Sequence, residues 1–139
     1  MRLSYKNHVE SLDHPRWKFK FTSDYSVKTC IVGYEVETVY CKLTTNGTLT
    51  IKKDYAYNGA NGCIARNSNI IPAGIHDCLY QLIIEGLLPP VCRRQADRVL
   101  YVQFKKWGMY SWLAWVEWKA VLAFQFCMER LGRGDAQVA

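Results

Sequence analysis

The chain has 139 residues and a formal net charge of +6 at pH 7, with a sequence pI near 9.0. This length fits one domain that can bury a core, and the charge favours an anionic partner such as nucleic acid, anionic phospholipid or an acidic protein surface. The sequence has neither an apolar N-terminal core segment nor 18 uninterrupted apolar residues, so we expect neither a signal peptide nor a transmembrane segment.

The cysteines favour thiols over a metal or disulfide framework. Six are present without C-x-x-C spacing, which gives little support for a zinc site: Cys30, Cys41, Cys63, Cys78, Cys92 and Cys127. Without a secretory signal, we expect them to be free and mostly buried. In particular, we interpret Cys78 and Cys92 as small buried groups rather than nucleophiles.

The first half of the chain is predicted to form β-strands. Residues 16–23 alternate polar and apolar side chains with period two, and 28–44 is rich in β-branched and aromatic residues. The Asn46-Gly47 pair predicts a hairpin that joins strands at about 34–43 and 48–53. Residues 57–69, rich in asparagine and glycine, are predicted to form a long loop.

The second half is predicted to hold three helices, at about 72–85, 91–107 and 110–131. Pro72 suits a first helical turn, and Gly86, Gly108 and Gly132 follow the three predicted ends. The expected fold is α+β, a small antiparallel β-sheet followed by three packed α-helices. We expect a single domain over 1–131 and a disordered tail over 132–139.

His76 stands in the most reactive stretch of the sequence, "IPAGIHDCLYQL". Tyr80 lies one helical turn further on the same face, and the short Pro-Pro turn brings the next helix back antiparallel with its one acid, Asp97. A carboxylate facing an imidazole holds its tautomer and stabilises its protonated form. We therefore predict His76 as a base, Asp97 as its orienting partner, and Asp77 as a second carboxylate that could bind a hard cation with loop carbonyls.

The segments "YNGANG", "IHDCLYQL" and "RRQADRVLY" together resemble the active-site layout of phospholipase A2 enzymes, in particular the short viral form in parvovirus capsid proteins. The resemblance implies a calcium-assisted lipid ester hydrolase. It assigns His76 and Asp97 to catalysis with support from Tyr80. It assigns calcium to Asp77 and to carbonyls near Tyr57, Gly59 and Gly62.

A second resemblance covers about residues 50–130. "YAYNGANG", "IHDCLYQLIIEGLL", "RRQADRVL" and "KKWGMYSWLAW" are similar to a family of small tailed-bacteriophage proteins of unknown function. Their shared pattern is Y-x-W-D-G-x-S-G, then H-D-A-L-Y-Q-L, A-D-R and G-M. Membership implies a viral protein in the host cytoplasm or the virion. Asn58 stands where that pattern has Asp, which removes one carboxylate that a cation could use.

Two interpretations of the His76 region remain open. In the first it is a hydrolytic site whose substrate is a phospholipid ester. In the second the polar side chains only shape the fold of a non-enzymatic phage protein, a virion component or an inhibitor of a host factor. Nucleic acid is not an expected partner, because the sequence has no recognition motif.

The last predicted helix is apolar on more than one side. Its expected core stripe consists of Leu113, Val116, Ala120, Phe124 and Cys127. Trp112, Trp115 and Trp118 form another stripe, for which two interpretations remain open. It is a second buried face against the sheet, or it contacts a partner protein or an anionic phospholipid membrane.

Overall fold

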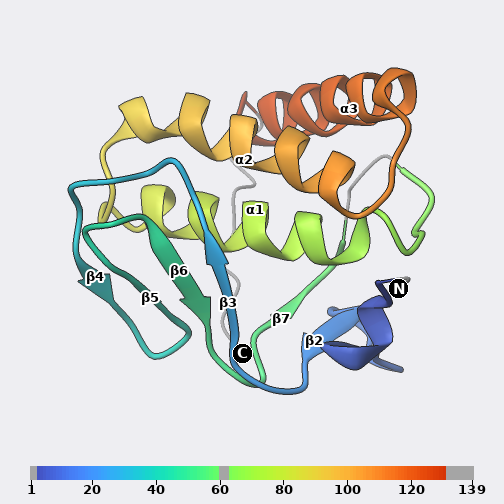
Figure 1. Cartoon of the computed structure of the whole chain (residues 1–139), viewed down its shortest axis with the longest axis horizontal. Coiled ribbons are helices and arrows are strands. Elements are labelled where there is room, and N and C mark those ends of the chain that lie inside the picture. The colour runs from blue at the N-terminus through green and yellow to red at the C-terminus, as the bar shows by residue number, and fades with distance from the viewer. Residues whose placement is uncertain (1–2, 60–62, 131–139) are drawn as a thin grey trace.

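The computed structural model describes residues 3–59 and 63–130, with side chains up to Cys127. Short strands fill the first half and helices the second, which confirms the predicted α+β fold (Figure 1). The predicted tail at 132–139 and the glycine stop at Gly132 lie outside the described residues.

The strands form two small antiparallel sheets rather than one. The first has the order β1-β2-β7, made of Val9–Ser11, Phe19–Phe21 and Ala56–Tyr57. The second has the order β3-β6-β5-β4, made of Tyr25–Lys28, Thr48–Ile51, Cys41–Leu43 and Val36–Glu37. A short 3-10 turn, η1, precedes them at Tyr5–Asn7.

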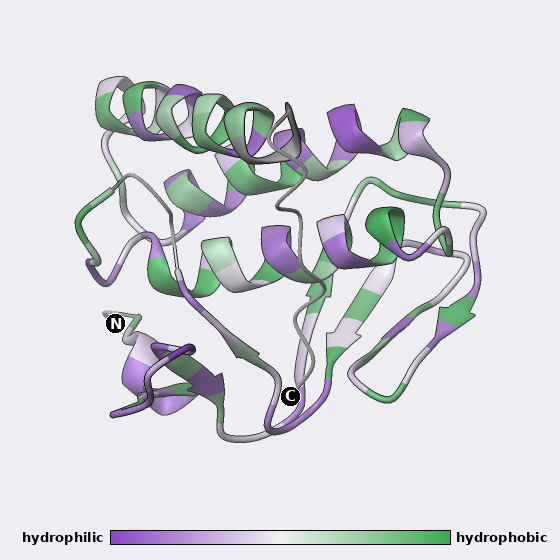
Figure 2. Cartoon of the chain, turned by 180° about the vertical axis from the view of Figure 1, so that it is seen from behind, coloured by the Kyte–Doolittle hydropathy of each residue, from purple (hydrophilic) through white to green (hydrophobic). Residues whose placement is uncertain are grey.

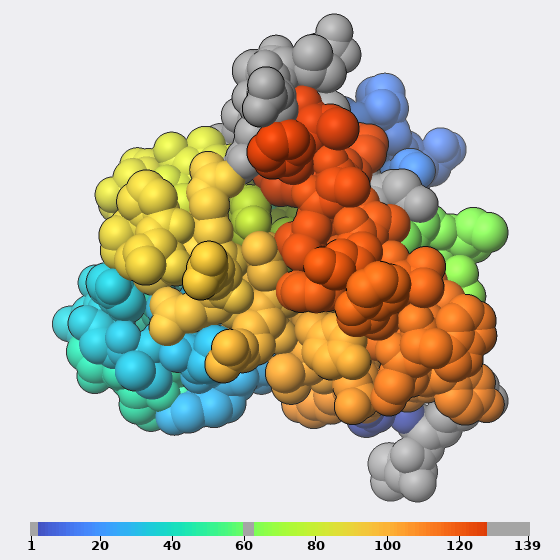
Figure 3. All heavy atoms as spheres, turned by 90° about the horizontal axis from the view of Figure 1, so that it is seen from above, coloured from blue at the N-terminus to red at the C-terminus, as the bar shows by residue number. Residues whose placement is uncertain are grey.

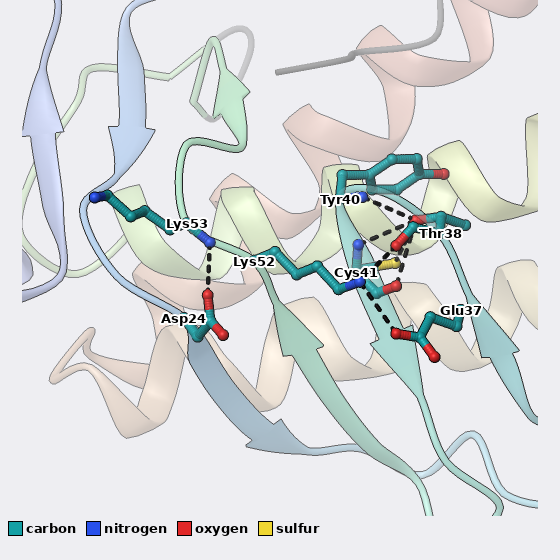
Figure 4. Close-up of polar contacts among 7 residues, drawn as sticks. All are labelled: Asp24, Glu37, Thr38, Tyr40, Cys41, Lys52 and Lys53. Carbon is teal, nitrogen blue, oxygen red and sulfur yellow. Dashed lines mark hydrogen bonds and ion pairs between the residues drawn. The ribbon is translucent and has the colours of Figure 1, made fainter.

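The hairpin predicted at Asn46-Gly47 is confirmed between β5 and β6. Gly47 has a φ of +91°, and an added Cβ would collide with the Thr29 carbonyl. The single strand expected at 34–43 is wrong, because the chain turns back within it to pair β4 with β5. At this turn the Thr38 hydroxyl accepts the amide of Cys41 at 3.0 Å, and Lys52 Nζ donates to the Thr38 carbonyl at 2.8 Å (Figure 4).

The helices stack in two layers above the strands. The first, α1 (Ile70–Ile84), lies between the sheets and a layer formed by α2 (Arg93–Lys106) and α3 (Ser111–Arg130), as Figure 1 shows. The 3-10 turn η2 (Pro90–Cys92) leads into α2. Gly86 and Gly108, at φ +78° and +95°, end the first two helices as predicted. None of the helices in the described part is long and apolar enough to cross a membrane.

The main core lies between the sheets and α1, where Phe21, Tyr55 and Tyr57 are fully buried. Gly74 of α1 lies directly against this aromatic layer, since an added Cβ would stand 2.8 Å from Cζ of Tyr57. The six cysteines are free as expected. Half of them are buried (Cys41, Cys78 and Cys92), so the expectation of mostly buried thiols holds only in part.

The predicted core stripe of α3 is wrong. Val116 and Phe124 are 48% and 39% exposed, whereas the buried positions are Ala114, Glu117 and Val121. The helix packs on α2, where Ala114 and Val121 join a second, smaller core with Leu100, Phe104 and Met109. Hydrophobic residues recur along this outermost helix (Figure 2), so its apolar pattern alone did not identify the buried side.

Candidate functional site

The predicted pairing of His76 with Asp97 is present. His76 Nε2 lies 2.9 Å from Asp97 Oδ1, across the contact between α1 and α2. The histidine is 1% exposed and the Asp97 side chain 18% exposed. The antiparallel return of α2 therefore places the carboxylate on the imidazole at the edge of the interior.

Other contacts fix Asp97 in place. The Tyr80 hydroxyl donates to the same Oδ1 at 2.8 Å, and the Tyr80 ring lies 4.4 Å from that of His76. From α3, Trp118 Nε1 donates to the Asp97 carbonyl at 2.7 Å. We call His76, Tyr80 and Asp97 the His76 cluster. Its aspartate is held by residues of both α1 and α3.

The hydrogen-bonding pattern indicates the tautomer of His76. An ionised carboxylate only accepts hydrogen bonds, so the proton between His76 and Asp97 belongs to Nε2. Nδ1 is then the nitrogen that carries a lone pair. Protonation at Nδ1 would create an imidazolium directly beside the Asp97 carboxylate, which stabilises it. The arrangement is that of a base with an orienting acid.

The residues assigned to calcium are only partly brought together. The charge of Asp77 adds to the effect of burial in raising the pKa of Tyr57, a residue of β7. The Tyr57 carbonyl, however, accepts the Lys18 amide at 3.2 Å within the sheet. Gly59, at φ +87°, approaches the Phe19 ring so closely that an added Cβ would lie 3.0 Å from it. Gly62 lies outside the described residues.

Among the described residues, the calcium ligands that the resemblance assigns form an incomplete set. The ion takes about six to eight oxygen ligands. The assigned residues that the structure describes supply one carboxylate, from Asp77, and the carbonyls of Tyr57 and Gly59, of which that of Tyr57 already accepts the Lys18 amide. Within residues 3–59 and 63–130, no group of three or more His, Cys, Asp or Glu side chains could hold a metal.

The tryptophans of α3 divide into two kinds. Trp112 and Trp115 are 69% and 55% exposed, so the interpretation as a buried face against the sheet is wrong for both. Trp118 is half-buried and contacts Asp97 through its ring nitrogen. A partner or membrane contact stays a prediction, and Trp112 and Trp115 are the residues exposed enough to make it.

The structure contains a second buried polar cluster that was not predicted from the sequence. Glu117 of α3 is 4% exposed; its Oε1 accepts Asn69 Nδ2 at 3.0 Å, and its Oε2 lies 3.0 Å from Arg66 Nη2. We call these three residues the Glu117 cluster. Cys63 lies beside it, and burial, followed by the charge of Glu117, raises the pKa of its thiol to about 11. The available signal was one acid within the apolar stretch 111–128.

The chain was compared with protein-family models, curated proteins and solved structures, and no match was found in any of them.

Proposed function

We propose that the protein hydrolyses phospholipid esters through the His76 cluster, in the manner of a phospholipase A2. The observation that carries the proposal is the 2.9 Å contact between His76 Nε2 and Asp97 Oδ1. It supports the proposal because it leaves Nδ1 as a base and places a carboxylate where imidazolium charge develops.

The proposed steps balance without further groups. Water adds to the ester carbonyl carbon while His76 Nδ1 takes one of its protons, and Asp97 stabilises the imidazolium. The bond between that carbon and the glycerol oxygen then breaks, and Nδ1 returns the proton to the departing oxygen. The products are a fatty acid and a lysophospholipid. Calcium, which the resemblance implies, has no complete ligand set among the described residues, and none of these steps involves it.

One observation favours the second candidate function. His76 is 1% exposed, and a general base must reach the water that it activates. In a non-enzymatic bacteriophage protein, the same hydrogen bonds would tie α1 to α2 and satisfy buried polar groups. The two candidates make different predictions for substitutions of His76.

Fatty-acid release from vesicles of equimolar phosphatidylserine and phosphatidylcholine distinguishes them. We expect His76→Gln to lower the rate by about 10³-fold, within the usual contribution of a general base. His14→Gln, which changes an exposed histidine, is the matched control and should keep the full rate. The assay is run with added calcium chloride and again with EGTA.

Release by His76→Gln at the rate of the unsubstituted protein would overturn the hydrolase. Absence of release by the unsubstituted protein, under both calcium conditions, would do the same and favour the structural role. Thermal unfolding of His76→Gln is measured in parallel, so that a lost rate is not mistaken for a lost fold.

A further inference from the structure

The outward side of α3 is apolar, although it faces away from the rest of the chain. The buried positions Ala114, Glu117 and Val121 lie on one side of the helix. Trp112, Trp115, Val116 and Lys119 share the opposite side by helical spacing, and the first three of them are 48–69% exposed. Surface helices ordinarily present polar residues there. This stretch presents one charged residue, Lys119.

Cations and aromatic rings alternate from α2 across to α3. Lys105 Nζ lies 5.8 Å from the centre of the Tyr101 ring, and Tyr101 meets Trp118 edge-on at 5.7 Å. Lys119 Nζ then lies 5.0 Å from the Trp118 ring and 5.7 Å from the Trp115 ring. Each distance is within the range of cation–π or aromatic pairing. The two helices therefore present one continuous surface.

The charges on this surface have one sign. Among the described side chains of α2 and α3, every exposed charged residue is basic: Arg94, Arg98, Lys105, Lys106 and Lys119. The acids among these described side chains, Asp97 and Glu117, are held in the clusters described above. Figure 3 shows α2 and α3 side by side on this side of the molecule. We call Trp112, Trp115, Val116, Lys105 and Lys119 the outer face.

The chemistry of the outer face argues against two of its conceivable occupants. A second copy docked by the same surface would bring the same basic residues together, with no exposed acid among the described side chains of α2 and α3 to meet them. Nucleic acid is bound mainly by cations placed along its phosphates, but the centre of this face is tryptophan and valine. An anionic bilayer can bind both the apolar centre and the basic residues of this face, because tryptophan rings enter its interfacial region while lysines reach its headgroups.

We propose that the outer face docks the protein onto anionic phospholipid membranes. The inference deepens the proposed function, on which it rests for its biological meaning, because it names the surface where the hydrolase would meet its substrate. Trp118 connects the two regions through its hydrogen bond to the Asp97 carbonyl. Docking itself needs no chemistry at His76.

Flotation with vesicles tests the proposal. Vesicles of equimolar phosphatidylserine and phosphatidylcholine should carry the full chain upward in a density gradient, and pure phosphatidylcholine vesicles should carry much less. We expect the double variant Trp112→Ser, Trp115→Ser to lower binding to the anionic vesicles at least tenfold. Lys105→Glu, Lys119→Glu should do the same, and high salt should remove the preference for anionic lipid.

Control variants make comparable changes at exposed positions elsewhere: one replaces an apolar residue by serine and the other replaces two lysines by glutamate. Val39→Ser alters a valine that is 83% exposed in the β4–β5 turn, and Lys28→Glu, Lys53→Glu makes the same charge change on the strands and their connection. Both should bind within about threefold of the unsubstituted protein, since these positions lie away from the outer face. Circular dichroism verifies that each variant is folded.

The proposal is overturned if the outer-face variants bind like the controls. It is also overturned if duplex DNA binds the chain while vesicles do not, or if sedimentation shows a dimer that the tryptophan variants dissociate. His76→Gln separates the two proposals, because it should bind vesicles fully even where it releases no fatty acid. If the protein releases no fatty acid but floats with anionic vesicles as expected, the proposed hydrolase is overturned and the proposed docking surface is supported.

Discussion

The helices contain two buried polar clusters, the His76 cluster and the Glu117 cluster, which have a similar arrangement of contacts but different chemistry. In each, a carboxylate from an outer helix meets polar groups of α1 or of the loop before it, at 2.8–3.0 Å. In the Glu117 cluster, the carboxylate meets a guanidinium and an amide. In the His76 cluster, it meets an imidazole and a phenol.

This difference separates a structural contact from a site that can react. The partners of Glu117 are a guanidinium, which stays protonated at any ordinary pH, and an amide, which does not titrate. The ion pair with Arg66 and the hydrogen bond from Asn69 leave no titratable base among the partners of Glu117. His76 has a second ring nitrogen, Nδ1, that can accept a proton, and the Asp97 carboxylate lies against the other ring nitrogen. Burial and pairing alone thus do not identify function.

Removing the Glu117 carboxylate should give the larger loss of stability. Its side chain is 5% exposed, and hydrogen bonds to charged groups contribute about 1.5–3 kcal/mol each. We expect Glu117→Ala to lower the free energy of unfolding by about 3 kcal/mol, because Arg66 remains partly solvated but Asn69 loses its buried acceptor. Urea denaturation followed by circular dichroism measures the change.

Glu10→Ala is the control for the Glu117 variant. Its carboxylate pairs with Lys20 at 3.2 Å but is 50% exposed, so the expected loss is below about 1 kcal/mol. Equal losses for Glu10→Ala and Glu117→Ala would contradict the structural weight assigned to the Glu117 cluster.

Asp97→Asn, in the His76 cluster, should lower the free energy of unfolding less than Glu117→Gln does in the Glu117 cluster. In Asp97→Asn the amide oxygen can still accept from Tyr80 and His76, so we expect a loss of about 1 kcal/mol. The Asp97 side chain is also nearer to solvent, at 18% exposure against 5% for Glu117. Urea denaturation of Asp97→Asn and Glu117→Gln side by side measures the difference. An equal or larger loss for Asp97→Asn would favour the structural interpretation of the His76 cluster.

The contrast also shows which contacts the sequence could predict. The contact between His76 and Asp97 could be predicted because it depends on neighbouring parts of the sequence. These are the helical spacing, the Pro-Pro turn between the two helices and the one acid on the second helix. The hairpin at Asn46-Gly47 and the helix ends at the glycines after α1 and α2 were predicted correctly for the same reason, since turn chemistry is encoded in neighbouring residues.

Contacts that depend on how distant elements pack were not predictable in this way. The partners of Glu117 lie 48 and 51 positions earlier in the chain, so no local pattern relates them. The buried side of α3 was missed because apolar residues occur around the whole helix and only packing on α2 selects one side. The strand expected at 34–43 is interrupted by the Thr38 turn, whose hydroxyl contacts replace ladder pairing.

The thiol of Cys63 gives the smallest and most local measure of the Glu117 cluster. Burial and the charge of Glu117 raise its pKa to about 11, while Arg66 opposes them. Glu117→Gln removes the negative charge and leaves Arg66, so the pKa of Cys63 should fall. At about pH 8.5 the thiolate fraction then rises, and we expect the thiol to react with Ellman's reagent a few times faster. The exposed Cys30 and Cys127 are first replaced by serine, so that Cys63 dominates the signal.

The same raised pKa of Cys63 contributes to the pH dependence of stability. Because the folded-state pKa lies above the ordinary value of 9.0, the neutral thiol favours the folded state. Its contribution is fully present below pH 9 and is lost as the pH rises toward 11. In Glu117→Gln the part of the alkaline loss that is due to Cys63 should shrink, and Cys63→Ser should remove that part, as urea midpoints across that range would show. Equal reaction rates for Glu117→Gln and its parent would mean that the Glu117 carboxylate does not influence the thiol of Cys63. The electrostatic effect of Glu117 would then be confined to Asn69 and Arg66.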